Sequence, residues 1–178
     1  MQVQMDDVGV RDSAARTMDR GRATEGGQMG IEDHGEPAEV DEFRSTVLAQ
    51  QIEAEDAFVT NGDPGPRMDL WSKQDPVTLF GAMGMSQSGW DKLSEMFTWV
   101  ASRFSEVSDF HFDVEVVGVD GEMAYTLGFE RFNGSIAGRP VEPVLVRVTH
   151  IYRRENGAWR IVHRHADNPG PDARMERP

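Results

Sequence analysis

The strongest structural signal in this chain is the stretch VRVTHIYRRENGAWRIVHRHAD, residues 146–167. Asn156 and Gly157 form a two-residue turn signal, because both residue types tolerate the positive φ angles of a tight hairpin. Apolar residues alternate with polar ones on either side of this turn, which is the two-residue period of a strand. The pattern therefore predicts an antiparallel hairpin with strands over residues 141–154 and 158–167.

A two-residue turn also fixes which residues face each other across the hairpin. The predicted pairs are His150 with His163, Tyr152 with Ile161, and Val148 with His165. Trp159 lies on the same face as Ile161 because alternate strand residues share a face, so we expect this face to be the concave one, covered by helices. The prediction therefore brings three histidines to the inner wall of a hollow, namely His150, His163 and His165.

Upstream of the hairpin, apolar residues recur at helical spacing in three segments, residues 43–59, 63–71 and 88–104. A short strand is expected at residues 75–80, and Asp120-Gly121 predicts a second hairpin whose returning strand carries Tyr125 on its apolar face. Helices followed by a curled meander indicate an α+β domain. The expected architecture is a strongly curved antiparallel sheet wrapped around N-terminal helices.

Composition separates the folded part of the chain from its ends. Residues 1–42 contain no Phe, Trp or Tyr. Such a segment lacks the apolar area that would offset the entropy lost on ordering it. We therefore expect a flexible acidic tail over residues 1–40, a folded domain over 41–168 and a C-terminal tail over 169–178, with Met29 as an alternative start of the chain.

Charge and residue usage exclude several classes of partner and chemistry. The formal net charge of −13 disfavours phosphate backbones and anionic membranes, so neither nucleic acid nor membrane is an expected partner. The absence of cysteine excludes disulfides, thiolate catalysis and cysteine-based metal sites. No apolar run is long enough to span a membrane and no signal-peptide pattern is present, so the expected compartment is the cytoplasm.

Three segments resemble SnoaL-like and ketosteroid isomerase-like proteins of the nuclear transport factor two-like superfamily. They are TNGDPGPRMDLWSKQDPVTLFGAMG (60–84), GEMAYTLGFER (121–131) and the hairpin stretch quoted above. The resemblance covers residues 41–168. It implies the cone-shaped form of this architecture, the cystatin-like roll, with a small-molecule pocket. It also implies a homodimer formed through the outer sheet face, where Arg147, Thr149 and Ile151 are expected. The superfamily includes isomerases, cyclases, dehydratases and non-catalytic modules, so the fold does not specify an activity.

The resemblance to ketosteroid isomerases also suggests a catalytic base. In that family a general-base Asp lies in an Asp-Pro-Val segment at the pocket mouth, and Asp75-Pro76-Val77 resembles this segment. The alternative is that Asp75 only starts a turn or strand. The family's two carbonyl-polarising residues, a Tyr and a protonated Asp, align near Glu55 and near His150 or Ile151, so both are missing. Authentic steroid isomerisation is therefore not expected, because it depends on stabilising the developing oxyanion.

Two groups of candidate site residues follow. The catalytic candidates are Asp75, His150 and His163, because an imidazole opposite a carboxylate can act as acid or base near neutral pH. The ligand-binding candidates are Trp71, Trp90, Phe97, Tyr125, Tyr152 and His165. The alternative is that these residues only fill the core and satisfy buried polar groups. His150, His163, His165 and Asp167 could also hold zinc or iron, but we expect neither a metal nor a cofactor.

The sequence thus leaves two functions open. The first is a cofactor-independent isomerase, cyclase or dehydratase that acts on a small apolar carbonyl compound by general acid/base chemistry. The second is a non-catalytic ligand-binding or dimerisation module of the same fold.

Overall fold

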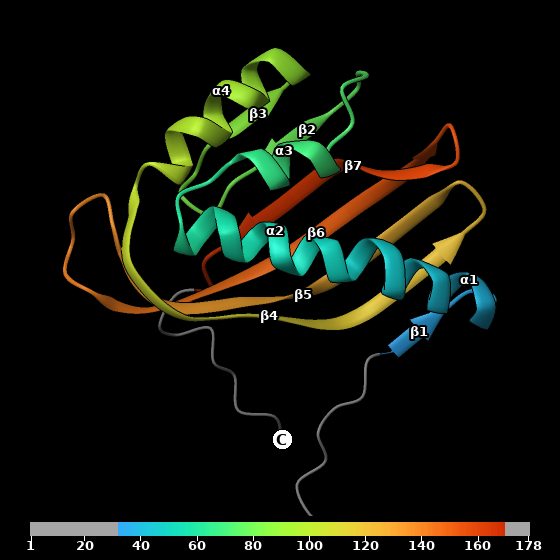
Figure 1. The fold of residues 1–178 in the computed structure, drawn as a ribbon, viewed down its shortest axis with the longest axis horizontal. Coiled ribbons are helices and arrows are strands. Elements are labelled where there is room, and N and C mark those ends of the chain that lie inside the picture. The colour runs from blue at the N-terminus through green and yellow to red at the C-terminus, as the bar shows by residue number, and fades with distance from the viewer. Residues whose placement is uncertain (1–31, 170–178) are drawn as a thin grey trace, which may run out of the picture.

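The computed structural model describes residues 32–169, so most of the expected N-terminal tail and nearly all of the C-terminal one lie outside it. Helices cover one face of a curled sheet (Figure 1). The helices are α1 (Pro37–Phe43), the π-helical turn η1 (Arg44–Leu48), α2 (Ala49–Thr60), α3 (Gly65–Leu70) and α4 (Trp90–Ala101). The strands are β1 (Glu32–His34), β2 (Thr78–Phe80), β3 (Ser86–Ser88), β4 (Phe104–Asp120), β5 (Met123–Ile136), β6 (Glu142–Glu155) and β7 (Ala158–Asp167).

The seven strands form one sheet in the order β1-β4-β5-β6-β7-β2-β3. The long strands β4 to β7 pair antiparallel, which confirms the predicted meander. Two short strands add parallel pairings that the sequence did not predict, β1 with β4 and β2 with β7. The sheet is therefore mixed rather than purely antiparallel, and its concave side faces the helices, as expected for the predicted α+β cone.

The folded part begins earlier than predicted. Glu32–His34 pair with β4 and Val40 is buried, although both segments were assigned to the tail. Gly35 makes this packing possible, because it adopts a φ of 127° and a Cβ there would lie 2.3 Å from the Val119 carbonyl oxygen. Only glycine fits such a close approach of two backbones.

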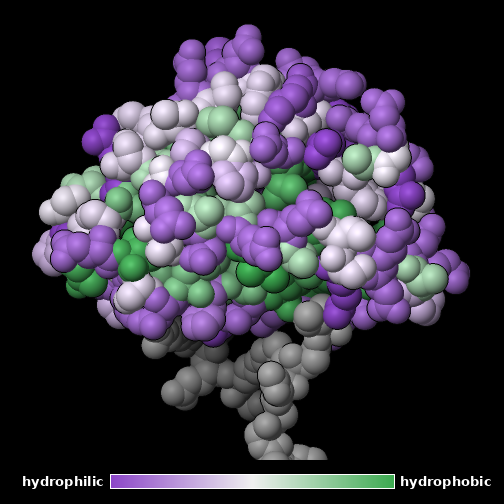
Figure 2. Space-filling model, viewed as in Figure 1, coloured by the Kyte–Doolittle hydropathy of each residue, from purple (hydrophilic) through white to green (hydrophobic). Residues whose placement is uncertain are grey.

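One continuous helical segment, α1 to α2, packs its apolar side against the sheet. Phe43 contacts Tyr152 and Trp159 edge to face, at centroid distances of 4.9 and 5.6 Å. The helix ends where predicted, at Asn61 and Gly62, and Gly62 has a φ of 66°. Polar residues cover most of the surface in this view, and apolar residues show between them (Figure 2). None of the helices in residues 32–169 is long and apolar enough to cross a membrane.

The last hairpin has the predicted turn but not the predicted register throughout. Asn156 and Gly157 adopt φ angles of 51° and 80°, and Tyr152 pairs with Ile161 as expected. Beyond this pair, a β-bulge leaves Val162 unpaired, so that Ile151 faces His163, His150 faces Arg164 and Thr149 faces His165. One extra residue reverses the facing of every later side chain. The predicted pairs of His150 with His163 and of Val148 with His165 are therefore wrong.

Candidate functional site

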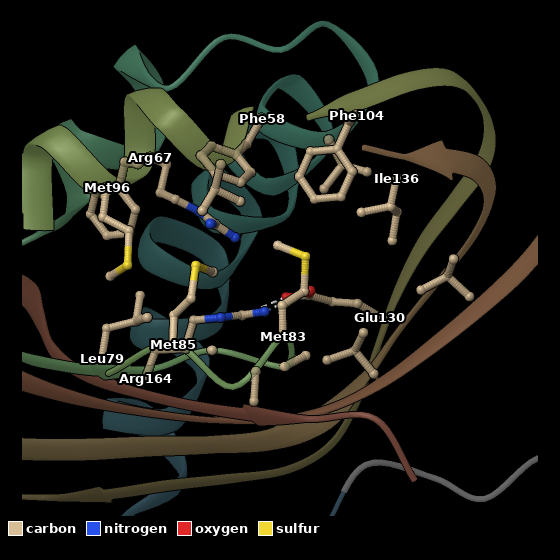
Figure 3. A pocket seen from close by; sticks show the side chains of 18 of the residues that line it. Phe58, Arg67, Leu79, Met83, Met85, Met96, Phe104, Glu130, Ile136 and Arg164 are labelled. Atoms are coloured by element: carbon tan, nitrogen blue, oxygen red, sulfur yellow. Dashed lines mark hydrogen bonds and ion pairs between the residues drawn. The ribbon is translucent and has the colours of Figure 1, made fainter. Parts of the chain in front are cut away.

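A cavity of about 90 Å³ lies between the helices and the concave face of the sheet. Its walls are mostly apolar and come from nearly every element of the cone, including Phe58 on α2, Met96 and Phe97 on α4, Phe132 on β5 and Val146 on β6. Three charged side chains also line it, Arg67, Glu130 and Arg164 (Figure 3). All three are buried. The cavity is therefore an apolar space with one charged wall, the arrangement typical of a small-molecule site.

The connection between β2 and β3 closes part of the cavity. Ala82, Met83 and Met85 from this connection line the space, together with Met96 from α4 (Figure 3). Met83 is 45% exposed, so this side of the cavity lies next to solvent. Methionine side chains are flexible, and these three can change the shape of the wall at low cost.

Arg67 belongs to the first of two buried ion pairs. Its Nη2 donates a hydrogen bond to Glu55 Oε2, and its guanidinium lies 3.6 Å from the centre of the Phe58 ring. Burial, and then the nearby charge of Arg164, place the pKa of Arg67 well below its usual range. This pair was not predictable from the sequence, because Glu55 lies in a helix rich in acidic residues and Arg67 lies in a short helix with mixed composition.

Glu130 and Arg164 form the second pair, across the sheet. Nη1 and Nη2 of Arg164 donate to the two carboxylate oxygens of Glu130 at 2.6 and 2.8 Å. Burial raises the pKa of Glu130, but the charge and hydrogen bonds of Arg164 and the charge of Arg67 outweigh it, so the net shift is downward. Glu130 is therefore an ionised carboxylate with both oxygens engaged.

His150 lies behind this pair, fully buried on β6. Its Nε2 is 2.9 Å from Arg164 Nη1, and since a guanidinium only donates, Nε2 accepts and the proton is on Nδ1. Burial, followed by the charges of Arg164 and Arg67, lowers the pKa of His150 well below its usual value. The imidazole is neutral. It faces the helices as predicted, but it does not line the cavity.

Tyr152 joins a second buried network on the same strand. Its hydroxyl donates to Gln51 Oε1 and lies 3.1 Å from Thr126 Oγ1. Burial raises the pKa of Tyr152 far above its usual value, so the hydroxyl stays protonated. Tyr152 is placed on the concave side as predicted, but its hydroxyl binds helix α2 and strand β5, and the side chain does not line the cavity.

Glu55, Glu130 and His150 could be mistaken for a metal site. Each offers a ligand atom, and these atoms lie within 4.8 Å of one another, the only such group in residues 32–169. However, Glu55 and Glu130 already bind the two guanidiniums, and His150 accepts from one of them. A cation would have to displace both arginines, so this donor set does not fit a resident metal. The alternative metal site is also wrong, because His150 faces inward while His163 and His165 face outward.

The other two catalytic candidates lie away from the cavity. Asp75 is exposed and accepts a hydrogen bond from the backbone N–H of Trp90 at 3.3 Å, at the start of α4. His163 lies on the outer face, where its Nδ1 is 2.7 Å from Thr78 Oγ1. Burial and the neighbouring His165 lower the pKa of His163. The expected convergence of Asp75, His150 and His163 is therefore wrong, for Asp75 because it lies at the helix start and for His163 because of the bulge.

The remaining aromatic candidates fall into three positions. Phe97 lines the cavity, whereas Trp71 packs behind it at a centroid distance of 5.1 Å. Trp90 lies near the surface under the ammonium group of Lys73. Tyr125 and His165 lie on the outer face of the sheet, opposite to the expected side. For Tyr125 the reason is that the inward set on β5 is the less apolar one, consisting of Ala124, Thr126, Gly128 and Glu130.

Comparison with known proteins identifies the family of the chain. Residues 56–169 match the sequence profile of the SnoaL-like domain family. The chain belongs to the SnoaL-like domain family. No protein of curated function matches the chain in sequence.

Solved structures place this SnoaL-like protein among cone-shaped relatives. A ketosteroid isomerase-like protein from Erwinia carotovora atroseptica has a TM-score of 0.62 at 17% identity, covering 74% of this chain and 99% of its own. A nuclear transport factor 2-like superfamily protein from Salmonella enterica serovar Typhimurium has a TM-score of 0.58 at 20% identity, covering 75% and 99%. A provisionally assigned dehydratase of the same superfamily from Streptomyces avermitilis has a TM-score of 0.58 at 22% identity, covering 74% and 96%. At these identities the similarity shows the fold alone.

Proposed function

We propose that this SnoaL-like protein binds a small, mostly apolar molecule in the cavity, with the polar end of the molecule against Arg67, Glu130 and Arg164. The observation that carries this proposal is the contrast between the apolar walls and the single charged wall. Apolar walls contribute affinity by removing the ligand from water, and a few polar groups fix its orientation.

Binding is better supported than the acid/base chemistry suggested by the sequence. Within residues 32–169, Glu130 is the one carboxylate that lines the cavity, and both of its oxygens accept hydrogen bonds from Arg164. A base with a lowered pKa and no free oxygen is poorly suited to take a proton from a ligand. Asp75 and His163, the groups expected to do so, lie outside the cavity. The non-catalytic alternative is therefore the function that we favour.

The size of the cavity limits the ligand. Its volume of about 90 Å³ is smaller than the cavity of ~150 Å³ that holds a benzene molecule in an engineered protein. A ligand of a few heavy atoms fits without rearrangement. A larger one requires Met83, Met85 or Met96 to move, which their flexibility permits.

Titration followed by amide NMR tests the proposal. Butanone and cyclohexanone serve as probes, and we expect concentration-dependent shifts at amides around the cavity. Val144→Phe fills the cavity from β6 and should abolish these shifts. Val141→Phe is the matched control, because Val141 is 49% exposed and does not line the cavity. Shifts that spread over the surface, or that persist in Val144→Phe, would count against the proposed site.

We also propose that a second copy of the chain covers the outer sheet face. This face carries exposed apolar side chains on β5, among them Met123, Tyr125 and Leu127. Ile151 and Thr149 lie beside them on β6, paired with Tyr125 and Leu127. Contiguous exposed apolar residues of this kind favour a protein contact.

A further inference from the structure

The side chain of Arg67 has one donor that is buried without an acceptor within residues 32–169. Its Nη2 is bound to Glu55, but its Nε is buried and has no hydrogen-bond partner among the described residues. Arg67 is 5% exposed and lines the cavity, into which its side chain extends (Figure 3). Leaving a buried donor without an acceptor is unfavourable, so an acceptor on a bound molecule would be stabilised there.

The charges around this donor are already balanced. Arg67 is paired with Glu55 and Arg164 with Glu130, which gives two positive and two negative groups. All four side chains are at most 8% exposed. His150, the remaining titratable group in contact with them, is neutral because burial lowers its pKa. A ligand carboxylate would therefore add one buried charge without a counter-ion.

We infer that the cavity selects neutral molecules with a hydrogen-bond acceptor, such as a ketone, ester or amide carbonyl, over carboxylates. Arg67 provides the donor for the acceptor, and the balanced charges of the two ion pairs disfavour the carboxylate. The inference rests on the proposed binding function. A neutral acceptor receives a charge-assisted hydrogen bond from Arg67 and leaves both ion pairs intact. An anion receives the same bond, but the desolvation of its charge is not compensated, because Glu55 and Glu130 cancel the arginines.

Two probes of nearly the same shape test the inference in the unmodified protein. Propionate has a second carboxylate oxygen where butanone has a methyl group, so the two probes differ mainly in charge. We expect butanone to bind about a hundredfold more tightly, which is the scale of leaving a buried charge uncompensated. The readout is the dissociation constant from amide NMR, together with the 15Nε resonance of Arg67, which should shift with butanone.

Two variants change the donor and the charge balance separately. Arg67→Lys keeps the positive charge beside Glu55 and removes Nε, so butanone binding should weaken by about tenfold. Glu130→Gln makes the group of four net positive, so propionate binding should strengthen by at least about tenfold. Glu122→Gln is the control for the change in total charge, because Glu122 is exposed in the β4–β5 turn. The amide spectrum of each variant reports whether it is folded.

The outcomes separate the inference from the proposed function. Failure of both probes to bind overturns both. Equal affinity for butanone and propionate, or a preference for propionate, overturns the selection and leaves the binding function standing. A Glu122→Gln variant that gains propionate binding as strongly as Glu130→Gln would show that total charge, not the buried balance, is responsible, and would overturn the inference. The comparison of butanone with propionate in the unmodified protein tests the inference even if a variant does not fold.

Discussion

Replacing Arg164 by methionine tests how much the buried charges contribute to stability. The change removes both hydrogen bonds to Glu130 and the one to His150 Nε2, while methionine keeps much of the side-chain volume. Glu130, 5% exposed as a side chain, would be left ionised without its main partner. Removing one partner of a buried pair costs about 3–5 kcal/mol, and for a domain of this size we expect the thermal midpoint to fall by roughly 10 °C.

The loss in Arg164→Met should depend on pH, and the sign follows from Glu130. In the unmodified protein the folded-state pKa of Glu130 is lowered, so the pair stabilises the fold above the unfolded-state pKa of ~4.3, and this contribution is lost as the pH falls. Without Arg164, burial, the largest influence on this carboxyl, should raise its pKa instead. As the pH falls, Glu130 of the variant becomes protonated, and the cost of burying an unpaired carboxylate is removed. The difference in unfolding free energy between the two proteins should therefore be largest near pH 7.5 and shrink toward pH 4.5.

Urea unfolding followed by tryptophan fluorescence measures this difference at both pH values. Arg147→Met is the matched control, because Arg147 on β6 pairs with Asp167 on β7 in the same sheet but both side chains are about half exposed, 53% and 43%. Exposed pairs contribute little, so no comparable loss is expected. A loss in Arg164→Met as small as in the control, or one that does not change between pH 7.5 and 4.5, would refute the idea that a buried, ionised Glu130 depends on Arg164.

Three further changes test separate features. Tyr152→Phe should lower the unfolding free energy by about 1–3 kcal/mol, measured by urea unfolding, because Gln51 loses a buried hydrogen-bond donor; an unchanged midpoint would contradict the network. Asp75→Asn should leave the butanone-induced shifts as they are, because the Asp75 side chain binds the first backbone N–H of α4 and does not line the cavity. Loss of butanone binding in this variant would show that Asp75 belongs to the site. Leu127→Glu should yield a monomer by light scattering, whereas Ile52→Glu, equally exposed at 37%, should not; two variants with the same mass would argue against the outer-face contact.

The fold was predictable because its signals are local. The two-residue turn at Asn156-Gly157 and the helix end at Gly62 each follow from backbone preferences of the residues themselves, and the structure has both. The family match confirms the predicted class. The parallel pairings of β1 and β2 were not predictable in this way, because three-residue strands carry too little alternation to reveal their partners.

The charged wall of the cavity was missed for a different reason. Glu55 and Arg67 each look like ordinary surface residues in their own segments, and only the packing of α2 against α3 brings them together. The bulge at Val162 was also not predictable from the sequence, because valine is common in regular strands and no neighbouring residue favours an unpaired position. Beyond the bulge, β7 pairs with β2 from His163 onward, a strand partner 85 positions away in the chain that the local sequence does not reveal.

A single unpaired residue therefore decides which chemistry the cavity contains. Near its end, strand β7 carries two alternating sets of side chains. The first set is the imidazoles of His163 and His165, and the second is the guanidinium of Arg164 and the methyl group of Ala166. Val162 turns the second set toward the helices and the first toward the outside. Moving the irregularity past Ala166 would exchange the sets without replacing any of the side chains involved. The same scaffold could in this way hold either a permanently charged wall or one that titrates near neutral pH.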